Sequence, residues 1–226
     1  MTGILYFLSA FAIFGGGIRR HEYDLSSKAC QPIRGIAILL IVIGHTVSHA
    51  GSKDLGFLNV GYFGVAIFFM LSGYGCIKGI QNKENYLSGF WHRRLPAILL
   101  PFISAHIVYM AVKLFCGETF TVKDILLGLI GECTIVEYSW YPIALLLMYV
   151  LFWLSCTFIK ESAPKVAIAL FGGVVLLTVL EYALLGTKHD WWYISNFSYV
   201  IGALLAVAFN YLNCHLTTLV SNLRNK

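Results

Sequence analysis

The sequence predicts an all-α fold: a polytopic membrane helical bundle of about seven transmembrane helices, with the N-terminus outside and the C-terminus cytoplasmic. Apolar residues make up 58% of its 226 residues and charged residues only 12%, about half the charged fraction of an ordinary soluble domain. Several stretches of 17–21 residues carry almost no charge, and a helix of that length crosses a bilayer. We therefore expect residues 1–226 to form a single transmembrane domain in the lipid bilayer.

The distribution of basic residues sets the expected orientation. The predicted spans are about 2–18, 33–50, 60–79, 96–115, 139–159, 166–185 and 194–212. With the N-terminus outside, 12 of the 16 lysines and arginines fall on one side, and the other side receives Lys53, Lys113, Lys123 and Lys188. Basic residues favour cytoplasmic loops. The net charge of +5 therefore mostly reflects the basic residues of the cytoplasmic loops. The sequence has no basic stripe interleaved with aromatic residues, so we do not expect it to bind nucleic acid.

The first span, within residues 1–20, is predicted to be an extra signal anchor. Its leading residues carry no basic charge, Arg19 and Arg20 follow the apolar run, and no small-residue cleavage site stands out. A secretory signal peptide has the opposite charge arrangement.

The second span carries the strongest indication of function, because Arg34 and His45 lie on it. They are 11 residues apart, which in a helix places them roughly 16 Å apart and within about 20° of one face. An ionisable group inside a membrane helix is by default a functional-site hypothesis. The alternative is a histidine that is hydrogen-bonded to a neighbouring helix for packing. His49 lies four residues further out, on nearly the same face.

The third span and the connector after it offer a notch and a basic cluster. Ser72, Gly73 and Gly75 leave room for a neighbouring backbone or a ligand, and a helix-packing seam explains them as well. The connector ends in Phe90-Trp91-His92-Arg93-Arg94. Its arginines can bind anions bidentately, or they form an ordinary positive-inside flank.

The fourth span contains two prolines, and a long outer connection follows it. We expect Pro96 to open this helix and Pro101 to kink it. Within residues 116–138, the apolar stretch 125–130 is too short to span, so we expect an interfacial or re-entrant segment. Glu137 lies close to Trp140. A carboxylate beside an aromatic face suits a sugar ligand, and an aromatic belt at the membrane edge explains the tryptophan equally well.

The last three spans raise two questions of detail. Glu181 lies one turn from the outer end of the sixth span, where we expect its carboxylate to reach the interface. The seventh span is expected to close at Asn213 and leave a short tail. Of the six cysteines, only Cys116 and Cys133 fall on the outer side, where they would either form a disulfide or remain free thiols.

Three stretches together resemble the acyltransferase-3 family of integral-membrane O-acyltransferases. The first runs from Arg34-Gly35 to Gly44-His45, the second is Gly64-Val65-x-x-Phe68-Phe69-x-x-Ser72-Gly73-Tyr74, and the third is Phe90-Trp91-His92-Arg93-Arg94 leading to Pro101. The resemblance covers about residues 25–212. Family members commonly have about ten spans and a second arginine where this chain has Ala97. The last few family helices are absent, so the chain is a truncated or shortened relative.

The resemblance implies a transferase that moves an acyl group, usually acetyl, from acyl-CoA to a hydroxyl of an extracytoplasmic glycan or lipid-linked sugar. It implies that His45 is the catalytic base or a transient acyl carrier. Acyl-CoA would bind at Arg34, Ser72, Gly73, Arg93 and Arg94, while His49, Glu137 and Trp140 would lie on the acceptor side. We expect no metal or other cofactor, with acyl-CoA as co-substrate, and a multi-pass location in the bacterial cytoplasmic membrane.

Two alternatives stay open at this point. In the first alternative, the chain is a non-catalytic or truncated acyltransferase-like protein that acts in surface-glycan export or assembly, or it needs a partner that supplies the missing helices. A metal or haem site at His45 and His49 is the other reading, with His106 as the remaining deeply placed histidine.

Overall fold

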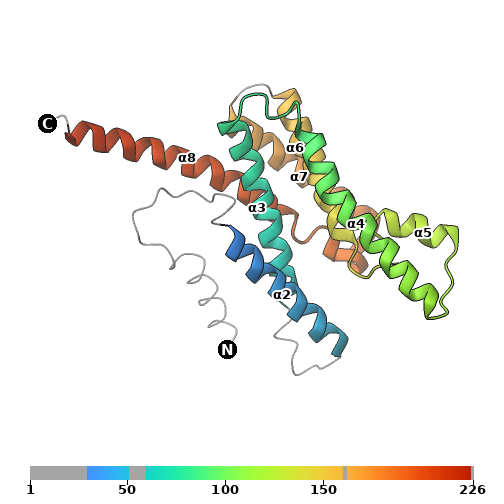
Figure 1. Ribbon diagram of the computed structural model, residues 1–226. Coiled ribbons are helices and arrows are strands. Elements are labelled where there is room, and N and C mark those ends of the chain that lie inside the picture. The colour runs from blue at the N-terminus through green and yellow to red at the C-terminus, as the bar shows by residue number, and fades with distance from the viewer. Residues whose placement is uncertain (1–29, 51–59, 160–161, 225–226) are drawn as a thin grey trace.

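The chain folds into a bundle of long helices, seen here in a computed structural model that describes residues 30–50, 60–159 and 162–224, with side chains except those of residues 50, 188 and 213–224. Within this part of the chain the structure contains helices and no strand (Figure 1). The long helices are α2 (Gln31–Ala50), α3 (Gly61–Asn82), α4 (Phe90–Phe115), α6 (Trp140–Phe158), α7 (Ala163–Leu185) and α8 (Asn196–Arg224). Two short elements, α5 (Val122–Leu129) and η2 (Gly186–Trp192), connect them.

Six helices in the described residues are long and apolar enough to cross a membrane. They correspond to the six predicted spans between residues 33 and 212, and their sequences carry the low charge that the bilayer core demands. The all-α prediction is confirmed, and the chain is a multi-pass membrane protein. The predicted span at residues 2–18 lies outside the described residues.

The centre of the bundle is the close packing of α3 against α8. Gly73 lies against the backbone carbonyl of Tyr199, and Gly202 lies against the carbonyl of Met70, so a methyl group at either glycine would overlap an oxygen atom. Small residues let two helix backbones approach in this way. Around this contact the core is aromatic, with Phe69, Phe90, Phe152 and Tyr199 all fully buried.

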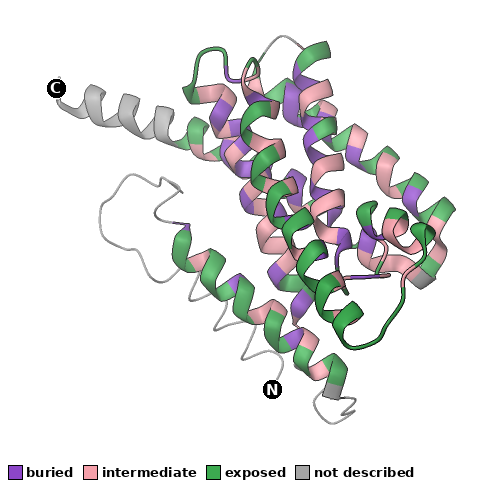
Figure 2. Ribbon diagram, turned by 45° about the vertical axis from the view of Figure 1, so that its right-hand side comes forward, coloured by how far each residue is buried: buried purple, intermediate pink, exposed green. Residues whose placement is uncertain are grey.

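Helix α2 is attached to the bundle along one narrow face. Gly44 meets Gly61, and Gly64 lies against the carbonyl of Ala37. Ala37 is fully buried, whereas most other residues of α2 are exposed (Figure 2). The helix that carries Arg34 and His45 is therefore held at the edge of the bundle, with most of its surface open to lipid or to another chain.

Helix α4 begins six residues earlier than the sequence suggests. It starts at Phe90 rather than at Pro96, and both prolines lie inside it. The expected boundary rested on Arg93 and Arg94, which a membrane helix normally excludes. Here Arg94 turns inward over the rings of Phe90 and Tyr149, so the helix extends through the arginines.

One expectation near the C-terminus is also wrong. Glu181 does not reach outward, because it is 7% exposed and its Oε2 accepts a hydrogen bond from Asn196 Nδ2 at 2.6 Å. The last membrane span ends at Leu212, as expected, and helix α8 continues beyond it to Arg224 and projects beyond the other helices (Figure 1).

The connection between α4 and α6 forms the expected short helix, α5, which is too short to span a bilayer. A capping box starts it: the Asp124 N–H donates to Thr121 Oγ1, and the Thr121 hydroxyl and N–H donate to the Asp124 carboxylate. These hydrogen bonds hold the pKa of Asp124 below its ordinary value. Val122 and Leu126 remain exposed, which suits a helix lying in the membrane interface.

Candidate functional site

His45 lines a cavity of about 530 Å³ between α2, α4 and the start of α6. Along α4 the lining residues are Ala97, Ile98, Pro101, Phe102, Ala105 and His106, which is a continuous stripe of nearly three turns. The rest of the wall is formed by Ile41, His45, Val65, Val136, Glu137, Tyr138, Ser139, Trp140, Tyr141, Pro142 and Leu145. The cavity is mostly apolar and runs lengthwise along α4, from Ala97 near the Arg93–Arg94 end to Tyr138 at the other.

At the Tyr138 end of the cavity, the imidazole of His45 stacks on the ring of Tyr138. The ring centroids are 3.6 Å apart and the planes differ by 22°. His45 is half-buried, because α2 covers one side of it and Tyr138 covers a face of its ring. Its edges carry the two ring nitrogens, and a side chain with this exposure keeps them within reach of a ligand.

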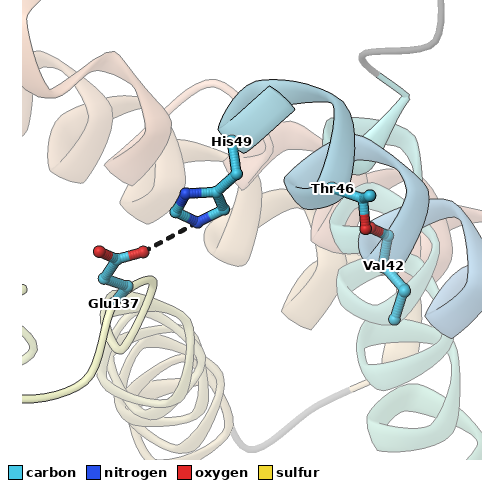
Figure 3. Close-up of polar contacts among 4 residues, drawn as sticks. All are labelled: Val42, Thr46, His49 and Glu137. Carbon is cyan, nitrogen blue, oxygen red and sulfur yellow. Dashed lines mark hydrogen bonds and ion pairs between the residues drawn. The ribbon is translucent and has the colours of Figure 1, made fainter. Parts of the chain in front are cut away.

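His49 and Glu137 are in polar contact beside this stack, and the contact is an ion pair when the imidazole is protonated. His49 Nε2 lies 3.0 Å from Glu137 Oε2, with both side chains about 60% exposed (Figure 3). The edge of the His49 ring meets Tyr138, with centroids 6.1 Å apart at 86°. The structure thus brings together three of the predicted residues, His45, His49 and Glu137, and joins the end of α2 to the loop before α6.

Trp140 lies in the wall of the cavity and does not stand free beside Glu137. It is 5% exposed and packs against Trp192 and Tyr141, with ring centroids 6.1 and 6.3 Å away. Trp140 and Glu137 both line the cavity, but the indole ring is buried against its neighbours rather than exposed to solvent.

The predicted basic residues lie at the opposite end of the bundle from His49. Arg34 is exposed near the start of α2. Arg94 Nη2 donates to the Tyr86 hydroxyl at 3.2 Å and lies 4.0 Å from Cys76 Sγ, whereas Arg93 Nη2 donates to the Tyr86 carbonyl at 2.6 Å. Arg94 lies three residues before Ala97, the first cavity residue on α4.

Ser72 and Gly73 lie away from this cavity. Gly73 faces α8, and the neighbour of Ser72 is the Tyr149 side chain. Neither residue belongs to the cavity wall. Of the two interpretations of this notch, the geometry is that of a helix-packing seam.

Tyr138 carries no motif that marks it in the sequence, whereas His106 stands out there only as a deeply placed histidine. Tyr138 belongs to an irregular loop, and its contact with His45 depends on how that loop folds. His106 is 5% exposed on α4, with Nδ1 2.9 Å from the carbonyl of Phe102. Its Nε2 is buried without a hydrogen-bond partner in the structure, close to Gly128 of α5.

The remaining candidate groups form no metal centre in the part of the chain that the structure describes. No three histidine, cysteine, aspartate or glutamate side chains come together there in a metal-binding arrangement, although His45 and His106 share the cavity wall. Cys116 and Cys133 are free and exposed, which corresponds to the free-thiol alternative.

Comparison with known proteins gives one result for almost the whole described region. A family model described as an acyltransferase domain matches residues 33–213. This range includes α2 through most of α8 and every residue of the cavity wall. No curated protein and no solved structure matches the chain significantly.

Proposed function

We propose a specific reaction for this chain, which belongs to the acyltransferase-3 family. It transfers an acetyl or similar acyl group from acyl-CoA to a hydroxyl of an extracytoplasmic glycan or glycolipid. Family membership makes the chain a membrane acyltransferase that transfers groups other than aminoacyl groups. The acyl donor, the acetyl group, the acceptor and the bacterial cytoplasmic membrane as its location belong to the proposal.

The single observation that carries the proposal is the position of His45 on the long apolar cavity. An enzyme that moves an acyl group from a cytoplasmic donor to an extracytoplasmic acceptor must hold the two polar substrates at opposite sides of the membrane. An apolar passage suits the thioester arm of acyl-CoA, because the arm is long and thin and its acyl end is uncharged. The cavity borders α4 on one side and α2 on the other, and His45 stands where its outer end begins.

His45 then acts as the general base on the acceptor hydroxyl. One ring nitrogen takes the hydroxyl proton as the acceptor oxygen attacks the thioester carbonyl. The carbon–sulfur bond breaks, and the departing CoA thiolate takes the proton from the imidazolium. Alternatively, the ring nitrogen attacks first and carries the acyl group transiently before the acceptor oxygen takes it.

The phosphates of acyl-CoA need cations at the inner end, and Arg34, Arg93 and Arg94 supply them. Support comes from Arg94, whose partners in the structure are a phenol, a thiol and two ring faces rather than a carboxylate. A guanidinium in a half-buried site is stabilised by a negative partner, and a phosphate would provide one. Arg34 lies at the start of α2, on the face that leads to His45.

The acceptor approaches from the end that carries His49, Glu137 and Trp140. The exposed ion pair of His49 and Glu137 offers both a donor and an acceptor for sugar hydroxyls. In this arrangement the reaction takes place in the space between this pair and His45. A glycan held there presents a hydroxyl to His45 without entering the apolar passage.

Mass spectrometry of surface glycans tests this proposal in cells that express wild type, His45→Ala or no protein. We expect wild type to add O-acetyl groups and His45→Ala to lose at least about 100-fold of the transfer rate, the low end of a general base's contribution. Thr46→Ala is the matched control, because Thr46 is exposed on the same helix and its hydroxyl donates to the Val42 carbonyl at 2.8 Å (Figure 3).

Membrane insertion of each variant is compared by immunoblot. Full transfer by an inserted His45→Ala protein would show that His45 is not the base. Absence of added acetyl groups with inserted wild type would favour the non-catalytic alternative, or the need for a partner that supplies further helices.

A further inference from the structure

We propose that Tyr138 is a positioning residue for His45: its ring fixes the plane of the imidazole at the mouth of the cavity and leaves the ring nitrogens free to react. This inference rests on the proposed function of His45. It concerns a residue outside every motif of the sequence, and the observations that carry it are a ring stack, a costly backbone conformation and the anchors on either side.

The stack leaves no space between the two rings. The centroids of His45 and Tyr138 are 3.6 Å apart and their planes differ by only 22°, which is van der Waals contact over most of the imidazole face. Aromatic pairs more often lie 4.5–7 Å apart. Tyr138 also meets the edge of His49. Its ring therefore contacts both histidines of the same helix face.

The backbone of Tyr138 adopts a conformation that a large side chain rarely takes. Its φ is 61°, and the other non-glycine residue with a positive φ in the described chain is Asn85 at 53°. Asparagine tolerates this left-handed region, whereas an aromatic residue there is unusual. Backbone strain of this kind persists where the surroundings enforce it, and it clusters at functional sites.

Buried anchors on both sides hold Tyr138 in this conformation. Ile135 is 2% exposed, and Ser139 is 5% exposed with its hydroxyl donating to the Glu132 carbonyl at 3.2 Å. Glu137, the residue before Tyr138, pairs with His49. The loop is therefore tied to the core by its flanks and to α2 by Glu137, and the strained residue between these ties has its ring on His45.

The consequence for His45 follows from how an imidazole acts as a base. A lone histidine on a half-exposed helix face rotates about two side-chain bonds, and its nitrogen points at the acceptor for only part of the time. A ring stacked on the imidazole prevents it from tilting out of its plane, and it leaves both ring nitrogens at the edge open. Orientation of a reacting group contributes strongly to rate, and a displacement of about 1 Å can cost 100-fold. Tyr138 acts through the ring and not through its hydroxyl.

The chemistry of the hydroxyl agrees with this division of roles. Burial, and then the neighbouring charge of Glu137, raises the pKa of Tyr138 above its ordinary value, so the phenol stays neutral at physiological pH. A neutral ring stacks on neutral or protonated imidazole alike, and it therefore holds His45 through the whole proton-transfer cycle.

Three variants of Tyr138 test the proposal in the full-length membrane protein. Tyr138→Phe keeps the ring, Tyr138→Leu keeps bulk without an aromatic plane, and Tyr138→Gly removes the ring while relieving the backbone strain. We expect kcat to stay within about twofold for Tyr138→Phe and to fall by roughly 10- to 100-fold for the other two, with a smaller change in KM. Tyr109→Leu, on the exposed outer face of α4, is the control and keeps both values.

A second readout does not depend on catalysis. Site-resolved mass spectrometry follows modification of His45 by diethyl pyrocarbonate, which reacts with accessible imidazole nitrogens. We expect the rate at His45 to change severalfold in Tyr138→Leu and Tyr138→Gly, and to match wild type in Tyr138→Phe and Tyr109→Leu. If the wild-type protein transfers no acyl groups, the proposed function is contradicted, but this test of positioning still applies.

Thermal unfolding separates positioning from a purely structural role. Tyr138→Gly should unfold at the same or a higher temperature than wild type, because glycine adopts a φ of this sign at little cost, while its kcat falls. A loss of kcat that follows a loss of thermal stability in all three variants would overturn the proposal. Equal loss in Tyr138→Phe and Tyr138→Leu would overturn it too, since the hydroxyl would then be the active part.

Discussion

Glu181 and Asn196 form a polar contact inside an otherwise apolar bundle. Asn196 is fully buried, and its Nδ2 donates both to Glu181 Oε2 at 2.6 Å and to Thr178 Oγ1 at 3.2 Å. The other carboxylate oxygen of Glu181, Oε1, and the amide oxygen of Asn196, Oδ1, are buried without a partner in the structure. Where lipid replaces water, a buried polar group depends on each hydrogen bond it makes. This pair therefore fastens α7 to the start of α8.

Removing the donor should be more damaging than removing the charge. We expect Asn196→Ala to lower the stability of the detergent-solubilised protein by about 1–3 kcal/mol, because it leaves the buried Glu181 side chain without its donor. Glu181→Gln keeps an oxygen that accepts from Asn196 and should cost less. Thermal unfolding measures both, with Asn210→Ala on the exposed face of α8 as the control. An Asn196→Ala protein as stable as wild type would contradict this account.

At the level of the helices, two reciprocal glycine contacts set the distance between α3 and α8. Gly73 and Gly202 each face a carbonyl oxygen of the other helix, so the two backbones touch at two points along the crossing. The rest of the core packs around this contact, including Tyr199, whose carbonyl Gly73 meets. Because a packed interior cannot absorb an added methyl group without moving, this crossing should be the most sensitive helix contact in the bundle.

Gly73→Ala and Gly202→Ala should each destabilise the bundle by roughly 1–3 kcal/mol or more, the usual cost of overpacking. Gly75→Ala is a matched control, since it lies on the same helix two residues away and a methyl group there meets nothing within 4 Å. Yield of folded protein and thermal unfolding report the difference. Equal behaviour of the Gly73 and Gly75 variants would mean that α3 and α8 are not packed this closely.

The same notch shows what a sequence pattern can and cannot predict. A run with Ser72, Gly73 and Gly75 indicates close approach of another backbone, but a single helix does not reveal which glycine faces the partner. Helix positions were predictable because a bilayer demands long apolar stretches. The start of α4 was not, because Arg94 is accommodated by rings from other elements, Tyr149 of α6 among them. Glu181 was misplaced for the same reason, as its partner belongs to α8.

Across the whole molecule, the catalytic hypothesis at His45 could be reached from the sequence, but its surroundings could not. Arg34 and His45 share one helix and therefore one periodic pattern. The cavity joins α2 to α4 and to the loop before α6, and no local pattern encodes that meeting. Tyr138 is the clearest case, because its role depends on a left-handed φ and on a loop anchored to the core at Ile135 and Ser139.

The direction of the cavity leads to a prediction about the acyl group. If the acyl end of the donor lies in the passage along α4, the space beside Ala105 limits its length. Ala105 is half-buried and lines the cavity one residue before His106. We expect Ala105→Phe to reduce kcat/KM for propionyl-CoA and longer donors at least about tenfold more than for acetyl-CoA, the usual scale for one methylene in a tight pocket.

Ile107→Phe supplies the matched control for this experiment, because Ile107 is 57% exposed on the same helix and points away from the passage. It adds bulk to α4 without narrowing the cavity, so its ratio of kcat/KM values for acetyl-CoA and propionyl-CoA should equal that of wild type. A fall in both rates by the same factor in Ala105→Phe would indicate general damage to α4. An unchanged ratio with undiminished activity would show that the acyl chain takes another path to His45, because bulk added to this wall would then have met nothing.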